Sequence, residues 1–132
     1  MSTDSTGRLW ISLGALNGFL SVALGAFAAH GLKHRLDTYA LGVFDKAVDY
    51  QMAHALALLA VGLLTVKVPR NRLLNWAGWS FTAGILLISG SLYVLALSGI
   101  RALGMITPLG GIGFLLGWGL LAWAAWRMAE PD

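Results

Sequence analysis

Charged residues are confined to short segments of this chain, and long apolar stretches lie between those segments. Four stretches contain no Asp, Glu, Lys or Arg at all, and they cover residues 9–29, 52–66, 73–98 and 102–126. A helix needs about 20 apolar residues to cross a hydrocarbon core of roughly 30 Å. The pattern therefore predicts four membrane-crossing helices.

The helical period starts well before the second apolar stretch. Ala40, Phe44, Ala47, Gln51 and His54 recur every three or four residues, as on one face of a helix. We expect one helix over 38–66 whose first turns stand outside the hydrocarbon. The predicted fold is all-α: a four-helix transmembrane bundle with an interfacial amphipathic extension before the second helix. It forms a single integral membrane domain over 1–132, with helices at about 9–29, 38–66, 73–98 and 104–126.

Composition supports this interpretation and excludes several others. Apolar residues make up 58% of the chain and charged residues 11%, with a mean hydropathy of +0.73, whereas soluble domains are about 45–50% apolar. Short loops leave no room for a separate catalytic or nucleic-acid-binding module. The basic residues are scattered through loops and termini, so no nucleic-acid partner is expected. With no cysteine, disulfides and thiolate metal sites are excluded.

An even number of crossings places both termini on one side of the membrane. That side carries five basic residues and the other side four: Arg8, Lys67, Arg70, Arg72 and Arg127 against Lys33, Arg35, Lys46 and Arg101. The positive-inside rule therefore favours cytoplasmic termini by one charge. The first apolar run is longer than the roughly 7–15 residues of a signal peptide, so we expect it to be retained as a helix.

Small residues fall at helical spacing inside the apolar stretches. Gly14 and Gly18 form a GxxxG pair, which lets two helix backbones approach closely in lipid. The glycines predicted to mediate helix packing are Gly14, Gly18, Gly25, Gly84, Gly90, Gly113 and Gly117.

Three short strings resemble a known family. They are GAFAAHGL at 25–32, AVDYQMAHA at 47–55, and ITPLGG at 106–111 after GSLY at 90–93. In combination, and over nearly the whole chain, they resemble the DUF423 family of small bacterial membrane proteins, which is related to the eukaryotic transmembrane protein 256 group. The resemblance implies a four-helix integral membrane protein and implies no reaction and no catalytic residues.

Two histidines are the main candidates for chemistry. His30 ends the first apolar stretch and His54 lies near the start of the second, so we expect both at the same face of the membrane, with Tyr50 and Gln51 one turn from His54. If the two helices are neighbours, the imidazoles would form a pocket for a lipid headgroup or quinone, a proton relay, or a metal or haem ligand pair. The simpler interpretation, which we favour, is that each histidine hydrogen-bonds a neighbouring helix.

The remaining polar candidates are weaker. Asn17 and Tyr93 are the deepest polar groups, and interhelical hydrogen bonds explain them adequately. Asp45 and Asp49 are four residues apart, which favours a solvated helix face over a carboxylate pair that shares a proton. No catalytic triad or metal-binding motif is present. We therefore expect no enzyme, no metal site and no identified cofactor, with haem or metal disfavoured.

Three functions remain open from the sequence. The first is a structural or accessory membrane protein that acts through helix packing, either as a homo-oligomer or within a larger membrane complex. The second is a small oligomeric transporter or channel without proton coupling, because the apolar stretches contain no Asp, Glu, Lys or Arg to carry protons. The third is a lipid- or quinone-binding protein that uses the interfacial His30/His54 pocket. The lipid bilayer is the one partner common to all three.

Overall fold

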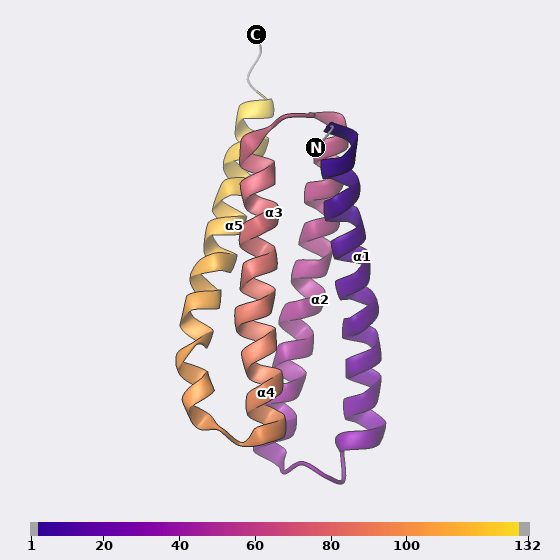
Figure 1. The fold of residues 1–132 in the computed structure, drawn as a ribbon, viewed down its shortest axis with the longest axis vertical. Coiled ribbons are helices and arrows are strands. Elements are labelled where there is room, and N and C mark those ends of the chain that lie inside the picture. The colour runs from indigo at the N-terminus through magenta and orange to yellow at the C-terminus, as the bar shows by residue number, and fades with distance from the viewer. Residues whose placement is uncertain (1–2, 130–132) are drawn as a thin grey trace.

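The computed structural model describes residues 3–129, and nearly all of them are helical. Four rods run up and down side by side (Figure 1). Their helical segments are α1 (Thr3–Phe27) with the π-helical turn η1 (Ala28–Leu32), α2 (Thr38–Lys67), α3 (Arg72–Ile85) continued by the π-helical turn η2 (Leu86–Gly90) and α4 (Ser91–Ser98), and α5 (Thr107–Met128) after the 3₁₀ turn η3 (Arg101–Met105). All four rods are long and apolar enough to cross a membrane.

Local sequence explains where the helices begin and end. The Asp37 carboxylate accepts a hydrogen bond from the Ala40 amide at 2.7 Å and so caps α2. Asn71 caps α3 in the same way, with its Oδ1 3.0 Å from the Leu73 nitrogen. Gly99 ends α4 with φ of 72°, a left-handed conformation that glycine adopts without strain. Pro108 lies in the first turn of α5, where its missing N–H costs nothing.

The rods form a row in which α2 and α3 are inner and α1 and α5 are outer (Figure 1). α1 packs mainly on α2, α5 packs mainly on α3, and α2 contacts both α3 and α4. In their most apolar 18-residue segments, the rods of α1 and α5 have only 17% of residues buried, against 44% for α2 and 50% for the rod formed by α3, η2 and α4. The outer helices therefore leave most of their apolar surface to the lipid or to a partner.

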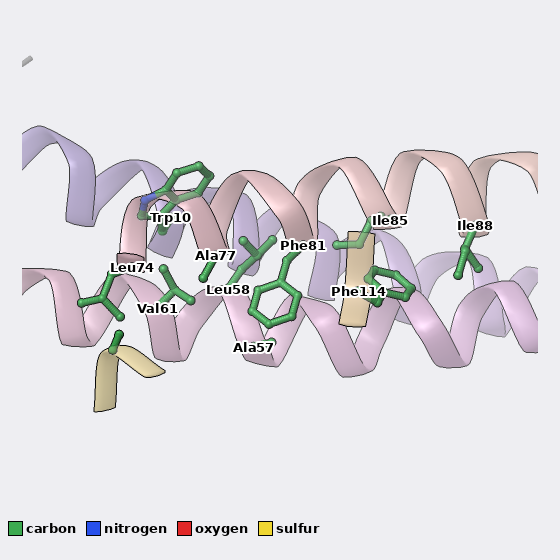
Figure 2. Close-up of a cluster of buried hydrophobic side chains, with 11 residues drawn as sticks. Trp10, Ala57, Leu58, Val61, Leu74, Ala77, Phe81, Ile85, Ile88 and Phe114 are labelled. Atoms are coloured by element: carbon green, nitrogen blue, oxygen red, sulfur yellow. The ribbon is translucent and has the colours of Figure 1, made fainter. Parts of the chain in front are cut away.

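The core lies between the inner helices and the near sides of the outer ones. Trp10 from α1, Leu58 from α2 and Phe81 from α3 are 0% exposed and belong to this cluster, with Trp10 toward the end that carries Leu74 (Figure 2). A second, smaller cluster joins the end of α1 to the start of α2 and to α4 through Ala28, Leu32, Phe44 and Ala96. Side chains thus fill the interior along its length.

The first turns of α2 form the amphipathic extension that the sequence predicts, and one side of them packs on the bundle. Phe44 is 1% exposed and Ala47 0% exposed on that side. Asp45, Lys46 and Asp49 are exposed on the other side of the same turns, as a solvated helix face requires. The extension continues into one helix that is about 45 Å long and packs beside α1.

Small residues form the seam between α1 and α2. Gly7, Gly14, Ser21 and Ala28 follow one another at intervals of seven, the repeat of a coiled-coil face. A Cβ at Gly14 would come within 2.8 Å of the Ala55 carbonyl oxygen, so the two backbones touch there. Gly18 is a correction to the sequence prediction, because a Cβ there would meet no atom within 4 Å. Asn17, rather than Gly18, is the next residue of α1 that faces α2 after Gly14, so Gly18 points away from α2.

A second glycine seam joins α3 to α5. A Cβ at Gly113 would lie 3.2 Å from the Ser80 carbonyl oxygen, and one at Gly110 would lie 2.8 Å from the Ile88 nitrogen. Gly84 and Gly117 instead make room for aromatic rings, as described below. Gly25 makes only an ordinary contact with Val48 at 3.4 Å. Gly90 is the other correction: it lies in η2 with no atom within 4 Å of its Cβ position.

Candidate functional site

The structure separates the two histidines that the sequence placed in one pocket. His30 is exposed in η1, at the loop end of the bundle, whereas His54 is 5% exposed. His54 lies 16 residues into α2, about 24 Å along the axis from Thr38 and about 20 Å from Lys67. It is therefore near mid-depth rather than at the interface, and the proposed His30/His54 pocket does not form. The sequence prediction failed because it counted depth from Met52 instead of from the helix start.

Both ring nitrogens of His54 have partners that define the tautomer. Nδ1 lies 2.7 Å from the Tyr50 carbonyl oxygen, which can only accept. Nε2 lies 3.1 Å from Nε1 of Trp118, and an indole N–H can only donate. His54 is consequently a neutral imidazole that donates from Nδ1 and accepts at Nε2. A second proton on Nε2 would face the Trp118 donor.

Aromatic rings from three helices enclose this imidazole. The Phe114 ring of α5 stacks on it with centroids 3.4 Å apart and planes 4° apart. Phe81 of α3 packs at 5.7 Å and Trp118 at 5.9 Å, while Tyr50 stacks on Phe114 at 5.8 Å. We call the five residues Tyr50, His54, Phe81, Phe114 and Trp118 the histidine stack. It joins α2 to α3 and α5 near the middle of the bundle.

Two glycines make the histidine stack sterically possible. A Cβ at Gly84 would come 2.3 Å from Cδ1 of Phe114, and one at Gly117 would come 2.6 Å from Cδ1 of Phe81. Each ring therefore rests against the bare backbone of the facing helix. Gly84 and Gly117 were both predicted to mediate helix packing. Each leaves space for an aromatic ring of the facing helix instead of bringing two backbones into contact.

A second polar cluster extends from the neighbouring residue on the same buried face of α2 toward other helices. The Tyr93 hydroxyl donates to Oε1 of Gln51 at 2.7 Å, and Nε2 of Gln51 donates to Oδ1 of Asn17 at 2.9 Å. Nδ2 of Asn17 in turn donates to the Leu13 carbonyl oxygen at 2.8 Å. We call Asn17, Gln51 and Tyr93 the amide chain. It links α1, α2 and α4, so the interhelical hydrogen bonds expected of Asn17 and Tyr93 are present.

The π-helical turn η2 carries a further link between helices. The Ser89 hydroxyl is buried and donates to the Ala47 carbonyl oxygen of α2 at 2.8 Å. The Ser91 hydroxyl lies 3.2 Å from that of Thr107 at the start of α5. A π-helical turn widens the helix by one residue, and here the widened turn presents its hydroxyl to α2.

One groove opens from the side of the bundle toward the histidine stack. It has a volume of about 280 Å³ and is lined by Lys46, Asp49, Tyr50, Ala53 and His54. Lys46 and Asp49 bring one positive and one negative charge to its polar end. Tyr50 and His54 form its aromatic inner end. Within residues 3–129, no group of three or more His, Asp or Glu side chains is arranged to hold a metal ion.

The comparisons with known proteins identify the family. A family model described as "Protein of unknown function (DUF423)" matches residues 24–111. The chain belongs to the DUF423 family. It is 48% identical to a UPF0382 membrane protein of Staphylococcus aureus (strain bovine RF122 / ET3-1) over 92% of this chain and 98% of the relative. It is also 48% identical to one from Staphylococcus saprophyticus, over 86% of this chain and 93% of the relative. No solved structure matches.

The DUF423 match covers only part of the two clusters. It includes Gln51, His54, Phe81 and Tyr93, but it stops before Phe114 and Trp118. Sequence reasoning missed Phe81, Phe114 and Trp118 as well. Phe114 and Trp118 are four residues apart, which puts them on one face of α5. That spacing was the available signal, but an aromatic pair in an apolar helix looks like a lipid-facing pair.

His54 also corrects the sequence argument against proton coupling. That argument rested on apolar stretches without Asp, Glu, Lys or Arg, and it overlooked a histidine at mid-depth. An ionisable group inside a membrane is a functional candidate by default. In this DUF423 protein, however, the group is held by a carbonyl acceptor and an indole donor.

Proposed function

We propose that this DUF423 protein is a structural or accessory protein of the bacterial plasma membrane that acts through helix packing, and that it is neither an enzyme nor a transporter. The observation that carries the proposal is that the polar groups of the histidine stack and of the amide chain already bind one another. A site for a substrate or an ion needs polar groups whose hydrogen-bonding capacity is open to the ligand.

The two clusters illustrate this saturation. His54 uses both ring nitrogens within the fold, and Gln51 uses both its oxygen and its nitrogen. Leu58 and Phe81, at the centre of the bundle, are 0% exposed, so side chains occupy the space that a conduit would need. These features favour a rigid packed body over a passive pore.

The outer helices supply the surface for such a role. Phe19 of α1 is 71% exposed and Leu115 of α5 is 75% exposed, and each lies on an outer helix with only 17% of residues buried in its most apolar segment. In lipid, helices associate through close packing rather than through a hydrophobic force. We propose that a second copy or a larger membrane complex packs against α1 or α5. The one-charge excess of basic residues supports cytoplasmic termini.

Cysteine scanning tests this proposal because the natural chain contains no cysteine. Single variants Phe19→Cys and Leu115→Cys probe the outer helices, and Val94→Cys, 51% exposed on α4, is the matched control. In native membranes we expect a discrete cross-linked product from an outer helix and none from Val94. Equal background cross-linking at all three positions, together with solute flux in liposomes, would contradict the proposal.

A second candidate function rests on the side groove. Its polar mouth at Lys46 and Asp49 and its aromatic floor at Tyr50 and His54 suit an amphiphile such as a quinone or a lipid. Ala53→Leu would fill the groove without removing a hydrogen bond, and Ala60→Leu, exposed two turns further along α2, is the control. If the protein purifies with a quinone or lipid that Ala53→Leu alone releases, the groove is a binding site. Retention in both variants would exclude it.

A further inference from the structure

A larger cavity lies at the opposite end of α2, where the α2–α3 turn meets the start of α1. Its volume is about 430 Å³. The lining side chains used in the argument below are Thr6 of α1, Thr65 of α2, Arg70 of the turn, and Arg72, Asn75 and Trp76 of α3. The histidine stack and the amide chain contribute nothing to it, so it is a separate site.

The lining is rich in hydrogen-bond donors and carries positive charge. Arg70 and Arg72 each bring a guanidinium group, and among residues 5–129 no Asp or Glu lines the cavity. Neither arginine forms an ion pair or hydrogen bond with the side chains of residues 5–129. Guanidinium groups bind phosphate oxygens through paired hydrogen bonds. The cavity therefore has the chemistry of a site for an oxyanion.

A buried donor lies one helical turn beyond the lining residue Thr6. Trp10 is 0% exposed, and its indole Nε1 has no hydrogen-bond partner. It follows the lining residue Thr6 by four residues, one helical turn or about 6 Å deeper. Figure 2 shows the indole nitrogen on the side of the ring nearer Leu74, toward the α2–α3 turn. An unpaired buried donor is rare, since leaving one costs about 1–3 kcal/mol.

Neighbouring tryptophans place the cavity at the level of lipid headgroups. Trp76 lines it and is 62% exposed, and Trp79, one turn further along α3, is 51% exposed. Tryptophan side chains gather at the membrane–water interface, where an indole contacts both acyl chains and water. The cavity thus opens beside the headgroup layer rather than into bulk water alone.

We propose that this cavity binds the phosphate group of an anionic phospholipid. Arg70 and Arg72 pair with the phosphate, Asn75 and Thr6 contribute uncharged polar groups, and the Trp10 N–H supplies a donor on the inner side. The site would hold one lipid firmly on the side of the membrane that carries both termini. It does not depend on the accessory role proposed above.

The test is native mass spectrometry of the full chain released from nanodiscs that contain equal phosphatidylglycerol and phosphatidylcholine. The variant is Arg70→Gln/Arg72→Gln, and Lys33→Gln/Arg35→Gln removes the same charge at the opposite end of the bundle. We expect wild type and the control to retain one phosphatidylglycerol. Two lost charges should lower its preference over phosphatidylcholine by roughly 25-fold, about fivefold for each. Trp10→Phe should lower it by about threefold, because it removes one hydrogen bond.

Two results would overturn the proposal. Equal loss in both double variants would show a general attraction of basic residues to anionic lipid. Displacement of the retained lipid by millimolar inorganic phosphate, with no preference for phosphatidylglycerol, would assign the site to free phosphate. Circular dichroism of each variant confirms that the helices are intact, so loss of lipid is distinguished from loss of fold.

Discussion

The amide chain and the histidine stack both include residues from the same two turns of α2, but different interactions hold them together. Gln51 faces α1 and α4 and joins a chain of neutral hydrogen-bonding groups. His54, three residues later, faces α3 and α5 and is enclosed by aromatic rings. The amide chain has one ring contact, between Tyr93 and Phe44 at 4.9 Å. The histidine stack packs several rings around His54 and depends on glycines that admit those rings. We therefore expect the histidine stack to contribute more to stability.

The largest effect is expected when the imidazole is removed. His54→Ala removes the stack on Phe114 and leaves the Trp118 N–H without an acceptor, so the free energy of unfolding should fall by about 3 kcal/mol. Unfolding by denaturing detergent in mixed micelles measures this. His30→Ala is the matched control, and because His30 is exposed the change there should be within about 0.5 kcal/mol. Equal losses would refute the separation of the two histidines.

The next largest loss of stability is expected at Gly84, which lies behind the Phe114 ring of the histidine stack. Gly84→Ala places a methyl group against Phe114 and pushes that ring off His54, which should cost about 2 kcal/mol by the same unfolding assay. Gly18→Ala, beside the amide chain, meets open space and should be neutral or stabilising by up to about 1 kcal/mol. If Gly18→Ala were the more harmful change, the α1–α2 seam assigned above would be wrong.

The amide chain is expected to give a smaller loss. Gln51→Leu keeps the volume but leaves the Tyr93 hydroxyl and Oδ1 of Asn17 without their partner, for a cost of about 1.5 kcal/mol. Adding Tyr93→Phe removes one of these orphaned groups. The double variant should therefore lose less than the two single variants summed, and strict additivity would show that the hydrogen bond contributes nothing.

The smallest change isolates one hydrogen bond in the histidine stack. Trp118→Phe keeps an aromatic ring and removes the donor to His54, so the cost should be about 0.6 kcal/mol. In detergent unfolding this should match Tyr93→Phe, which removes one donor from the amide chain. A cost several-fold larger for Trp118→Phe would mean that the hydrogen bond, rather than ring packing, holds the stack together.

The sequence predicted the crossings well because charge-free stretches of about 20 residues have few alternatives. It predicted less about which faces meet. α5 is apolar on all sides, so nothing in its pattern indicates that Phe114 is buried and the half-exposed Trp118 reaches His54, while Leu115 faces outward. In a soluble helix the polar face would have fixed this rotation. The rotation of a membrane helix is instead set by where its small residues meet a neighbour.

The errors at Gly18 and His54 have equally specific causes. The GxxxG pair predicts a step of four residues, but the α1–α2 seam advances three residues from Gly14 to Asn17. His54 was placed at the interface because apolar character begins near it, while the helix itself starts 16 residues earlier at Thr38. Asn17 and Tyr93 were easier to predict, because a deep polar side chain in lipid needs a partner on another helix.

The most direct test of the account is nitrogen NMR of His54 in nanodiscs. The variant His30→Asn/His34→Asn leaves His54 as the only histidine, and ¹⁵N-labelled histidine then reports on its two ring nitrogens at neutral pH. The account predicts a single neutral tautomer, with the proton on Nδ1 and a bare Nε2 that couples to the Trp118 N–H. A doubly protonated ring, or one that exchanges both protons rapidly with water, would contradict the closed, packed interior on which the proposed function rests.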